Sequence, residues 1–130
     1  MRNIGLTGAL ALVGLLALPA TSQAQDPVPL YPQNYRVLFE NDQVRVLDFR
    51  LAKGATEKTH SHPANVAVFL NDVNIRFTLA DGQTRIRRAR AGEVAYSGPT
   101  AHASENIGDA DAHGILVELK TPRQPATNGQ

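Results

Sequence analysis

The feature that most constrains the fold of this 130-residue chain is a series of short apolar runs separated by turn signals. Residues 73–79 alternate strictly between apolar and polar side chains, which is the pattern of a β-strand with one buried face. Asp81-Gly82 follows directly and is a strong hairpin signal. Similar runs recur, and we expect strands at residues 35–40, 44–51, 56–62, 66–70, 73–79, 84–90, 94–96, 102–106 and 114–120.

These runs predict an antiparallel all-β domain, because about nine short strands at near-regular spacing are typical of a sandwich or barrel. No segment after residue 24 has a convincing 3.6-residue period, so helices are not expected there. The continuous apolar run 66–70 predicts a strand that is buried on both faces. The four arginines in 84–90 are expected on one solvated face, with an anion-binding patch as the alternative.

The N-terminal 24 residues have the features of a secretory signal peptide. Their apolar stretch, residues 4–18, has 15 residues and is too short to span a bilayer, while Ser22 and Ala24 suit a cleavage site after residue 24. We therefore expect a secreted or periplasmic protein with no membrane segment once the leader is removed. The predicted divisions are a signal peptide at 1–24, a proline-rich arm at 25–34, one domain at 35–120 and a disordered tail at 121–130.

The composition excludes several classes of partner and chemistry. The chain has 13 basic and 12 acidic residues, and Arg2 belongs to the leader, so the mature domain is close to neutral. A neutral domain has no electrostatic basis for binding nucleic acid or anionic membranes. The chain has no cysteine, which excludes disulfides, thiolate metal ligands and a cysteine nucleophile.

Two histidines, His60 and His62, lie two positions apart in the expected strand 56–62. Residues i and i+2 of a strand point to the same face, so the two imidazoles can share one metal ion. His102, from another expected strand, is the candidate for a third ligand. The alternative is that the three histidines are unrelated. His113 is expected to be a surface residue and not a ligand.

The histidine pair resembles the first motif of the cupin superfamily. That motif runs Gly, five residues, His-x-His, three or four residues, Glu, six residues and Gly. Gly54 and the sequence His60-Ser-His62 match its first half. The glutamate is absent, because Val66 or Ala67 stands in its place, and the closing glycine is also missing.

The region around His102 resembles the second cupin motif, which runs Gly, five residues, Pro-x-Gly, two residues, His, three residues and Asn. Gly92, His102 and Asn106 match it, and the interval from His to Asn is kept. The interval from Gly to His is one residue short, and Ser97-Gly98-Pro99 replaces Pro-x-Gly. Together the two motifs span residues 54–106, about half of the mature chain.

The resemblance implies a single cupin-type antiparallel β-barrel, also described as a jelly roll or double-stranded β-helix. It implies a divalent metal ion at the barrel centre, with His60, His62 and His102 as its ligands. Three further residues are candidates for contacts around these ligands. They are Asn65, which would reach the metal or hold a bound water, Glu57, a conceivable general base, and Asn106 of the second motif.

Glu57 and Glu105 could each act as a general base, but each could equally be a surface carboxylate. Three neutral imidazoles leave a net 2+ charge and about three open coordination positions, which suit an anionic or chelating substrate, water or dioxygen. Since three-histidine iron dioxygenases occur among cupins, one expected class is a metal-dependent oxygenase, isomerase or lyase acting on a small polar molecule. The other is a non-catalytic module that binds a metal or small ligand.

The expected metal is zinc or copper, because imidazole ligands follow the usual divalent affinity order and no carboxylate or soft ligand reverses it. Iron, manganese and nickel are the alternatives. Affinity should fall near about pH 5 to 6, since each imidazole must lose its proton before it can ligate. A homodimer is also expected, because the proline-rich arm has little to pack on within so small a barrel.

Overall fold

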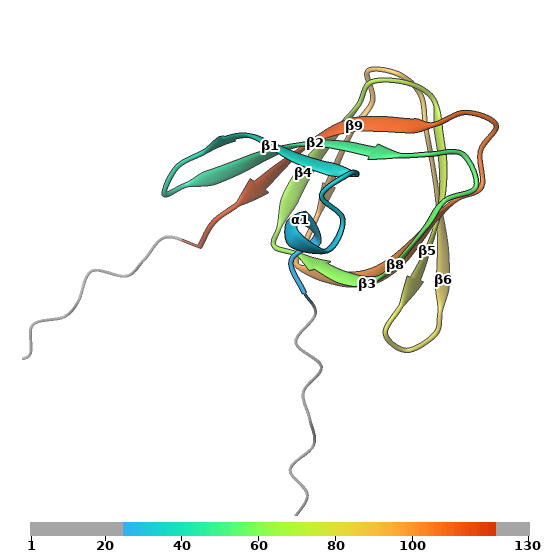
Figure 1. Ribbon diagram of the computed structural model, residues 1–130, viewed down its shortest axis with the longest axis horizontal. Coiled ribbons are helices and arrows are strands. Elements are labelled where there is room, and N and C mark those ends of the chain that lie inside the picture. The colour runs from blue at the N-terminus through green and yellow to red at the C-terminus, as the bar shows by residue number, and fades with distance from the viewer. Residues whose placement is uncertain (1–24, 122–130) are drawn as a thin grey trace, which may run out of the picture.

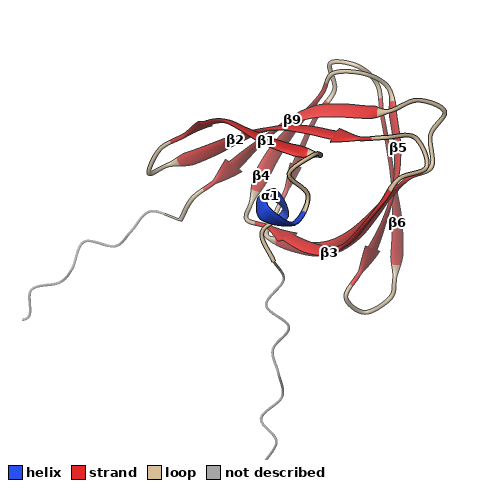
Figure 2. Ribbon diagram, in the orientation of Figure 1, coloured by secondary structure: helices blue, strands red, loops and turns tan. Residues whose placement is uncertain are grey.

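The computed structural model describes residues 25–121, which form a barrel of two β-sheets with one short helix (Figures 1 and 2). The predicted signal peptide and the tail from residue 122 onward lie outside the described residues. In order, the elements are α1 (Pro27–Leu30), β1 (Tyr35–Glu40), β2 (Val44–Leu51), β3 (Thr56–His62), β4 (Asn65–Phe69), β5 (Val73–Leu79), β6 (Thr84–Ala89), β7 (Val94–Ser97), β8 (Thr100–Asn106) and β9 (Ala112–Leu119).

Both sheets are antiparallel. One has five strands in the order β1-β2-β9-β4-β7, and the other has four in the order β3-β8-β5-β6. From β2 onward the chain crosses between the sheets at every connection except the β5–β6 hairpin. Repeated crossing between two facing sheets is the topology of a jelly roll, so the fold class predicted from the sequence is confirmed.

The observed strands begin and end within two residues of those predicted. Local turn chemistry explains this agreement, because Gly54, Gly82 and Gly92 have positive φ angles of 73°, 82° and 86° in three of the predicted turns. The prediction that 66–70 is buried on both faces is wrong. Leu70 lies beyond the end of β4 and is 47% exposed, and the middle residues of β4 are only partly buried. Strand β4 belongs to one of two facing sheets, so only one of its faces is packed between them.

The barrel interior contains an apolar core and a group of buried polar side chains. Alternate residues of β2 (Leu47, Phe49 and Leu51) point inward and are buried, as period-2 alternation requires. Buried polar groups need hydrogen-bond partners, so their positions mark where the interior has a specialised role. In the interior they are Glu57, His60, His62, Asn65, Ser104, Asn106 and Glu118, whereas the buried Asp48 has the outward parity of β2.

The segment 25–34, predicted as a proline-rich arm, contains the short helix α1, so the expectation of no helix after residue 24 is wrong at this point. The Oδ1 atom of Asp26 accepts a hydrogen bond from the backbone N–H of Val28 at 3.0 Å and caps α1. Pro27 occupies the first turn, where its missing N–H is not needed. No helix in the part of the chain that the structure describes is long and apolar enough to cross a membrane.

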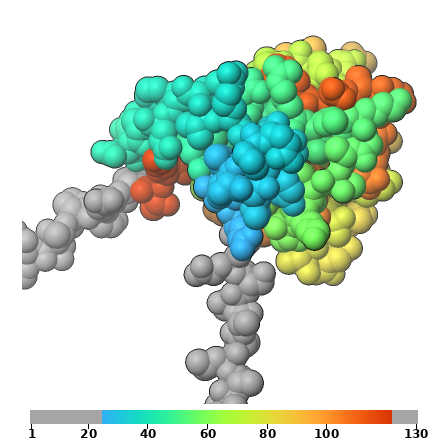
Figure 3. Space-filling view, viewed as in Figure 1, coloured from blue at the N-terminus to red at the C-terminus, as the bar shows by residue number. Residues whose placement is uncertain are grey.

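This N-terminal segment packs on its own barrel, as Figure 3 shows. The Asp26 carboxylate pairs with Arg45 of β2 at 2.7 Å, and the Tyr31 hydroxyl accepts a hydrogen bond from the N–H of Lys58 on β3 at 2.6 Å. The Tyr31 ring also lies edge-on to His60, with 5.8 Å between ring centroids. The expectation that the arm has little to pack on is therefore wrong.

Candidate metal centre

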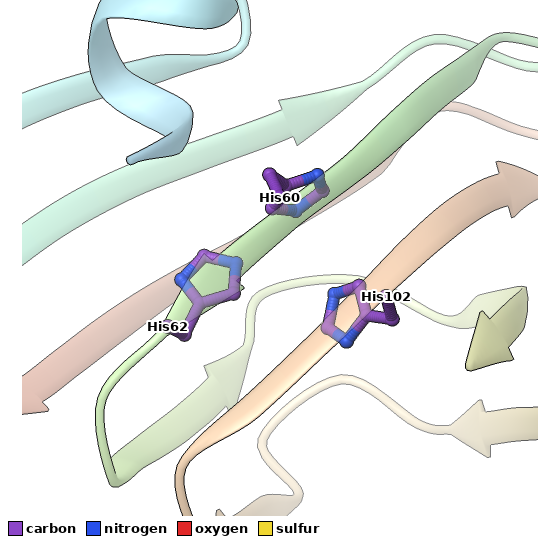
Figure 4. Close-up of side chains that lie close together, drawn as sticks. All are labelled: His60, His62 and His102. Atoms are coloured by element: carbon purple, nitrogen blue, oxygen red, sulfur yellow. The ribbon is translucent and has the colours of Figure 1, made fainter. Parts of the chain in front are cut away.

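Three histidines converge inside the barrel from two neighbouring strands (Figure 4). His60 and His62 share one face of β3, and His102 of β8 lies directly opposite His60 in the strand pairing. One ring nitrogen from each can be chosen so that all three lie within 4.8 Å of one another. The convergence predicted from strand parity and the second motif is thus present in the structure.

The imidazole of His62 is oriented by a carboxylate that the sequence analysis did not identify. Its Nδ1 donates to Oε1 of Glu118 at 2.8 Å, which leaves Nε2 with a free lone pair. The other oxygen of Glu118 accepts a hydrogen bond from Arg45 at 2.7 Å. Burial alone would raise the pKa of Glu118, but the hydrogen bonds from His62 and Arg45 outweigh burial and lower it. Glu118 therefore stays ionised in a buried position.

The imidazole of His60 is oriented by the backbone. Its Nδ1 donates to the carbonyl oxygen of Lys58 at 2.9 Å, so its Nε2 also carries a free lone pair. That Nε2 lies 3.4 Å from the Tyr35 hydroxyl and 3.7 Å from Oε2 of Glu57. Burial, with a smaller contribution from the nearby His62, lowers the pKa of His60 and keeps the ring neutral at pH 7.

His102 completes the group. Burial, together with the neighbouring His60 and His62, lowers its pKa to about 3, so its imidazole is neutral at physiological pH. Its ring packs against Phe77 of β5 with 4.5 Å between centroids. His60 and His102 therefore offer neutral nitrogen donors, which is the form that metal ions bind.

Glu57 is held in a buried hydrogen-bonding network. Its carboxylate accepts hydrogen bonds from Asn34 Nδ2 at 2.6 Å, Tyr35 Oη at 3.0 Å and Ser104 Oγ at 2.7 Å. The alternative that Glu57 is a surface carboxylate is therefore wrong. Glu105, by contrast, is 40% exposed and pairs with Arg76 at 2.7 Å. Glu57 is the buried carboxylate beside His60, and Glu105 belongs to the surface.

The two candidate asparagines occupy different environments. Asn65 of β4 lies beside Glu118 in the strand pairing and lines the cavity next to the histidines, and its Nδ2 donates to the carbonyl of Pro63. The amide of Asn106 donates to the carbonyls of Leu51 and Ala110, at 2.9 Å each, and so joins the turns after β2 and β8. Asn106 is four residues beyond His102 on β8, about 13 Å along the strand.

His113 lies outside the group. On β9 the buried Ala112 and Glu118 belong to the inward-facing set, so His113 has the outward parity. Its Nε2 lies 3.3 Å from Oδ2 of Asp48, and its side chain is 23% exposed. This position agrees with the expectation that His113 is not a ligand.

A cavity of about 640 Å³ adjoins the histidines. His62, His102 and Asn65 form one part of its wall. Apolar side chains, including Phe69 and Phe77, line much of the remainder. The volume lies within the range of about 300 to 1,000 Å³ that is usual for small-molecule sites. Two of the three imidazoles, those of His62 and His102, therefore border a space large enough for a small organic molecule.

Comparison with solved structures identifies the fold. A cupin domain from Bordetella pertussis superposes with a TM-score of 0.61 at 19% identity, over 67% of this chain and 92% of that chain. An RmlC-like cupin family protein from Methanocaldococcus jannaschii gives a TM-score of 0.54 at 12% identity, covering 86% of this chain and 95% of that chain. A cupin superfamily protein from Desulfitobacterium hafniense gives 0.51 at 16% identity, over 67% and 76%.

The sequence matches no family model and has no significant match among curated proteins. The fold, however, is that of a cupin, with the double-stranded β-helix that the sequence motifs imply. The histidine group lies where the two motif-bearing strands β3 and β8 pair, and it could hold a metal ion.

Proposed function

We propose that the protein binds one divalent metal ion through His60, His62 and His102. The observation that carries this proposal is the convergence of three imidazoles whose nitrogens lie within 4.8 Å of one another. Hydrogen bonds on Nδ1 of His60 and His62 place the ring proton on that nitrogen and leave Nε2 unprotonated in both, and a ligand imidazole normally makes such a bond through its other nitrogen. A metal ion bound there would supply a Lewis acid with open coordination positions.

The proposed role of this centre is metal-dependent binding of a small molecule in the adjoining cavity. Catalysis as an oxygenase, isomerase or lyase is the second candidate, and Glu57, buried 3.7 Å from the ring of His60, favours it. A non-catalytic binding module remains the alternative, because among the described residues no aspartate or glutamate lines the cavity. Oxygen uptake and product analysis with candidate substrates distinguish the two.

We further propose that the protein is exported and takes up zinc or copper. The general secretory route carries unfolded chains, so the barrel would fold and acquire its metal outside the cytoplasm. Neutral imidazoles bind these two metals more tightly than iron or manganese. Exported protein should begin at Gln25 by mass spectrometry and contain zinc or copper, whereas iron should appear only in protein expressed without the leader. Stoichiometric iron in exported protein would contradict this loading argument.

The metal-binding proposal is tested by elemental analysis of purified variants. The double variant His60→Ala/His62→Ala should lose the metal, whereas His113→Ala, the matched control on the outer face, should keep it. His60 is fully buried, so His102→Ala, at a partly exposed position, provides a second test that depends less on folding. Wild-type metal content in folded His102→Ala and in the folded double variant would refute the proposal.

A further inference from the structure

The arginines of β6 do not share one face of the strand. Arg85 pairs with Phe77 of β5, and Arg87 pairs with Ile75. Residues directly opposite in an antiparallel pair project to the same face, and Ile75 is buried in the barrel. Arg85 and Arg87 are therefore on the inward-facing side, whereas Arg88 has the outward parity. The expectation of a single solvated arginine face is wrong.

Both inward-facing arginines line the cavity at its exposed edge. Within residues 25–121, neither guanidinium has a hydrogen bond or an ion pair. An arginine that faces a barrel interior without a carboxylate is available to an anion from solution, since its planar donors match carboxylate geometry. Four other arginines in residues 25–121 have carboxylate partners: Arg36, Arg45, Arg50 and Arg76. Arg88 and Arg90 have no carboxylate partner in the same residues, but they lie outside the cavity lining.

The charged side chains that line the cavity are positive. Its described lining includes Arg85 and Arg87 but no aspartate or glutamate, so no fixed negative charge on the lining opposes an anionic ligand. Apolar side chains, including Phe77 and Leu79 of β5, lie on the strand between the arginines and His102. Strands β8, β5 and β6 are consecutive neighbours, which puts His102 and the arginines on strands about 10 Å apart.

We propose that the cavity binds a small organic acid, with its carboxylate held by Arg85 and Arg87 and its apolar body against Phe77 and Leu79. The end of the molecule opposite its carboxylate then faces the histidines. Only the contact of that end with a metal ion rests on the proposed function; the contact of the carboxylate with the arginines does not. The arginines select for charge, and the apolar strand between them and the histidines selects for a hydrocarbon body.

The test uses a matched pair of probes, 3-phenylpropionate and 3-phenylpropionamide, which have the same shape but differ in charge. Binding is measured by isothermal titration calorimetry on the leaderless mature chain, both zinc-loaded and after zinc removal. In both forms the acid should bind about tenfold or more tightly than the amide, as expected for charge-assisted hydrogen bonds. In Arg85→Gln/Arg87→Gln this preference should disappear.

The control variant is Arg88→Gln/Arg90→Gln, which removes the same charge outside the cavity lining. It should keep the preference for the acid. The inference is overturned if the acid shows no detectable binding, if acid and amide bind equally to wild-type protein, or if the control loses the preference as the cavity variant does. Retention of the preference in Arg85→Gln/Arg87→Gln would also overturn it, because the carboxylate would then be bound elsewhere.

Zinc content, measured on each sample, separates this inference from the proposed function. A protein that prefers the acid but retains no zinc would refute the metal site and support the arginine site. A protein that binds zinc and shows no preference between acid and amide would leave the metal site intact and refute the arginine site.

Discussion

Glu118 connects the histidine group to the outer part of the barrel. It accepts a hydrogen bond from His62 at 2.8 Å and pairs with Arg45, which in turn pairs with Asp26 beside α1. An ionised carboxylate on Nδ1 fixes the tautomer of the imidazole and raises the basicity of its Nε2. The orientation of one proposed ligand therefore depends on charges contributed by β9, β2 and the N-terminal segment.

Replacing Glu118 with glutamine should weaken metal binding about 10- to 100-fold, because the neutral amide no longer polarises His62. The measurement is competition against a chelating zinc indicator at pH 7. Glu105→Gln is the matched control, since this carboxylate is 40% exposed and pairs with Arg76 at the surface. Equal zinc affinity in Glu118→Gln and wild-type protein would show that the carboxylate has no role at the metal.

His102 makes the metal-free protein sensitive to acid. Burial lowers its pKa to about 3 in the folded state, against about 6.5 in the unfolded chain, so the unfolded state binds more protons between these values. The contribution of neutral His102 to the free energy of unfolding is therefore fully present above about pH 6.5. It is lost progressively as the pH falls toward 3. Between pH 7 and pH 5 the free energy of unfolding should decrease by about 2 kcal/mol from this residue alone.

Urea denaturation with a chelator present measures this dependence, and His102→Gln should show a smaller decrease between the same two pH values. If the free energy of unfolding of His102→Gln fell between pH 7 and pH 5 by as much as that of wild-type protein, the acid sensitivity would come from titratable groups other than His102. Because burial lowers the pKa of His102 to about 3, the ring of this residue is already neutral at about pH 5 to 6 in the folded metal-free protein. Burial also lowers the pKa of His60.

Strand β9 illustrates how closely the elements of the barrel pack. Gly114 lies opposite Phe49 on β2 and Phe69 on β4, so it sits between two aromatic residues of the core. A Cβ atom at this position would lie 3.0 Å from the carbonyl oxygen of Val68 and 3.5 Å from Cδ1 of Phe49. The centre of the five-stranded sheet therefore requires a residue without a side chain.

Gly114→Ala should destabilise the fold by about 1 to 3 kcal/mol, since the added methyl group displaces either a backbone carbonyl or the Phe49 ring. Gly98→Ala is a matched control, because nothing lies within 4 Å of its added Cβ and its φ angle is not positive. Chemical denaturation of both variants gives the comparison. A Gly114→Ala protein as stable as wild type would mean that β4 and β9 can move apart at little cost.

At the scale of the whole molecule, the β1 edge of the five-stranded sheet is exposed and apolar. The β1–β2 hairpin extends away from the barrel (Figure 1), and β1 is the edge strand of its sheet. Its three consecutive apolar residues Val37, Leu38 and Phe39 are 40%, 47% and 54% exposed. An exposed apolar edge strand tends to pair with another chain. This surface replaces the N-terminal arm as the reason to expect a homodimer.

We therefore expect wild-type protein to sediment as a dimer at tens of micromolar. Phe39→Lys should shift the equilibrium toward monomer, because a charged side chain on an edge strand opposes pairing. Ile86→Lys places the same charge at a 51% exposed position on β6, the edge strand of the other sheet, and should leave the dimer intact. A wild-type monomer at this concentration would exclude the homodimer.

The sequence by itself determined the strands and the histidine group. Period-2 alternation and turn glycines act within a few residues, so strand boundaries followed from local sequence to within two positions. The shared face of His60 and His62 is also a local property of one strand. The cupin-like spacing then indicated His102 as the third member, and the structure brings it directly opposite His60.

Only the tertiary structure decided which other side chains surround that group. Glu118 appears in the sequence as one acidic residue in an apolar strand, and its contact with His62 exists because the two sheets face each other across the interior. The hydrogen bonds that satisfy the buried Glu57 likewise come from distant parts of the chain: Asn34 and Tyr35 at the start of β1, and Ser104 of β8. Arg85 and Arg87 became cavity residues through their register with β5. Alternation within a strand separates two faces, but strand pairing and sheet packing determine which face lies inside.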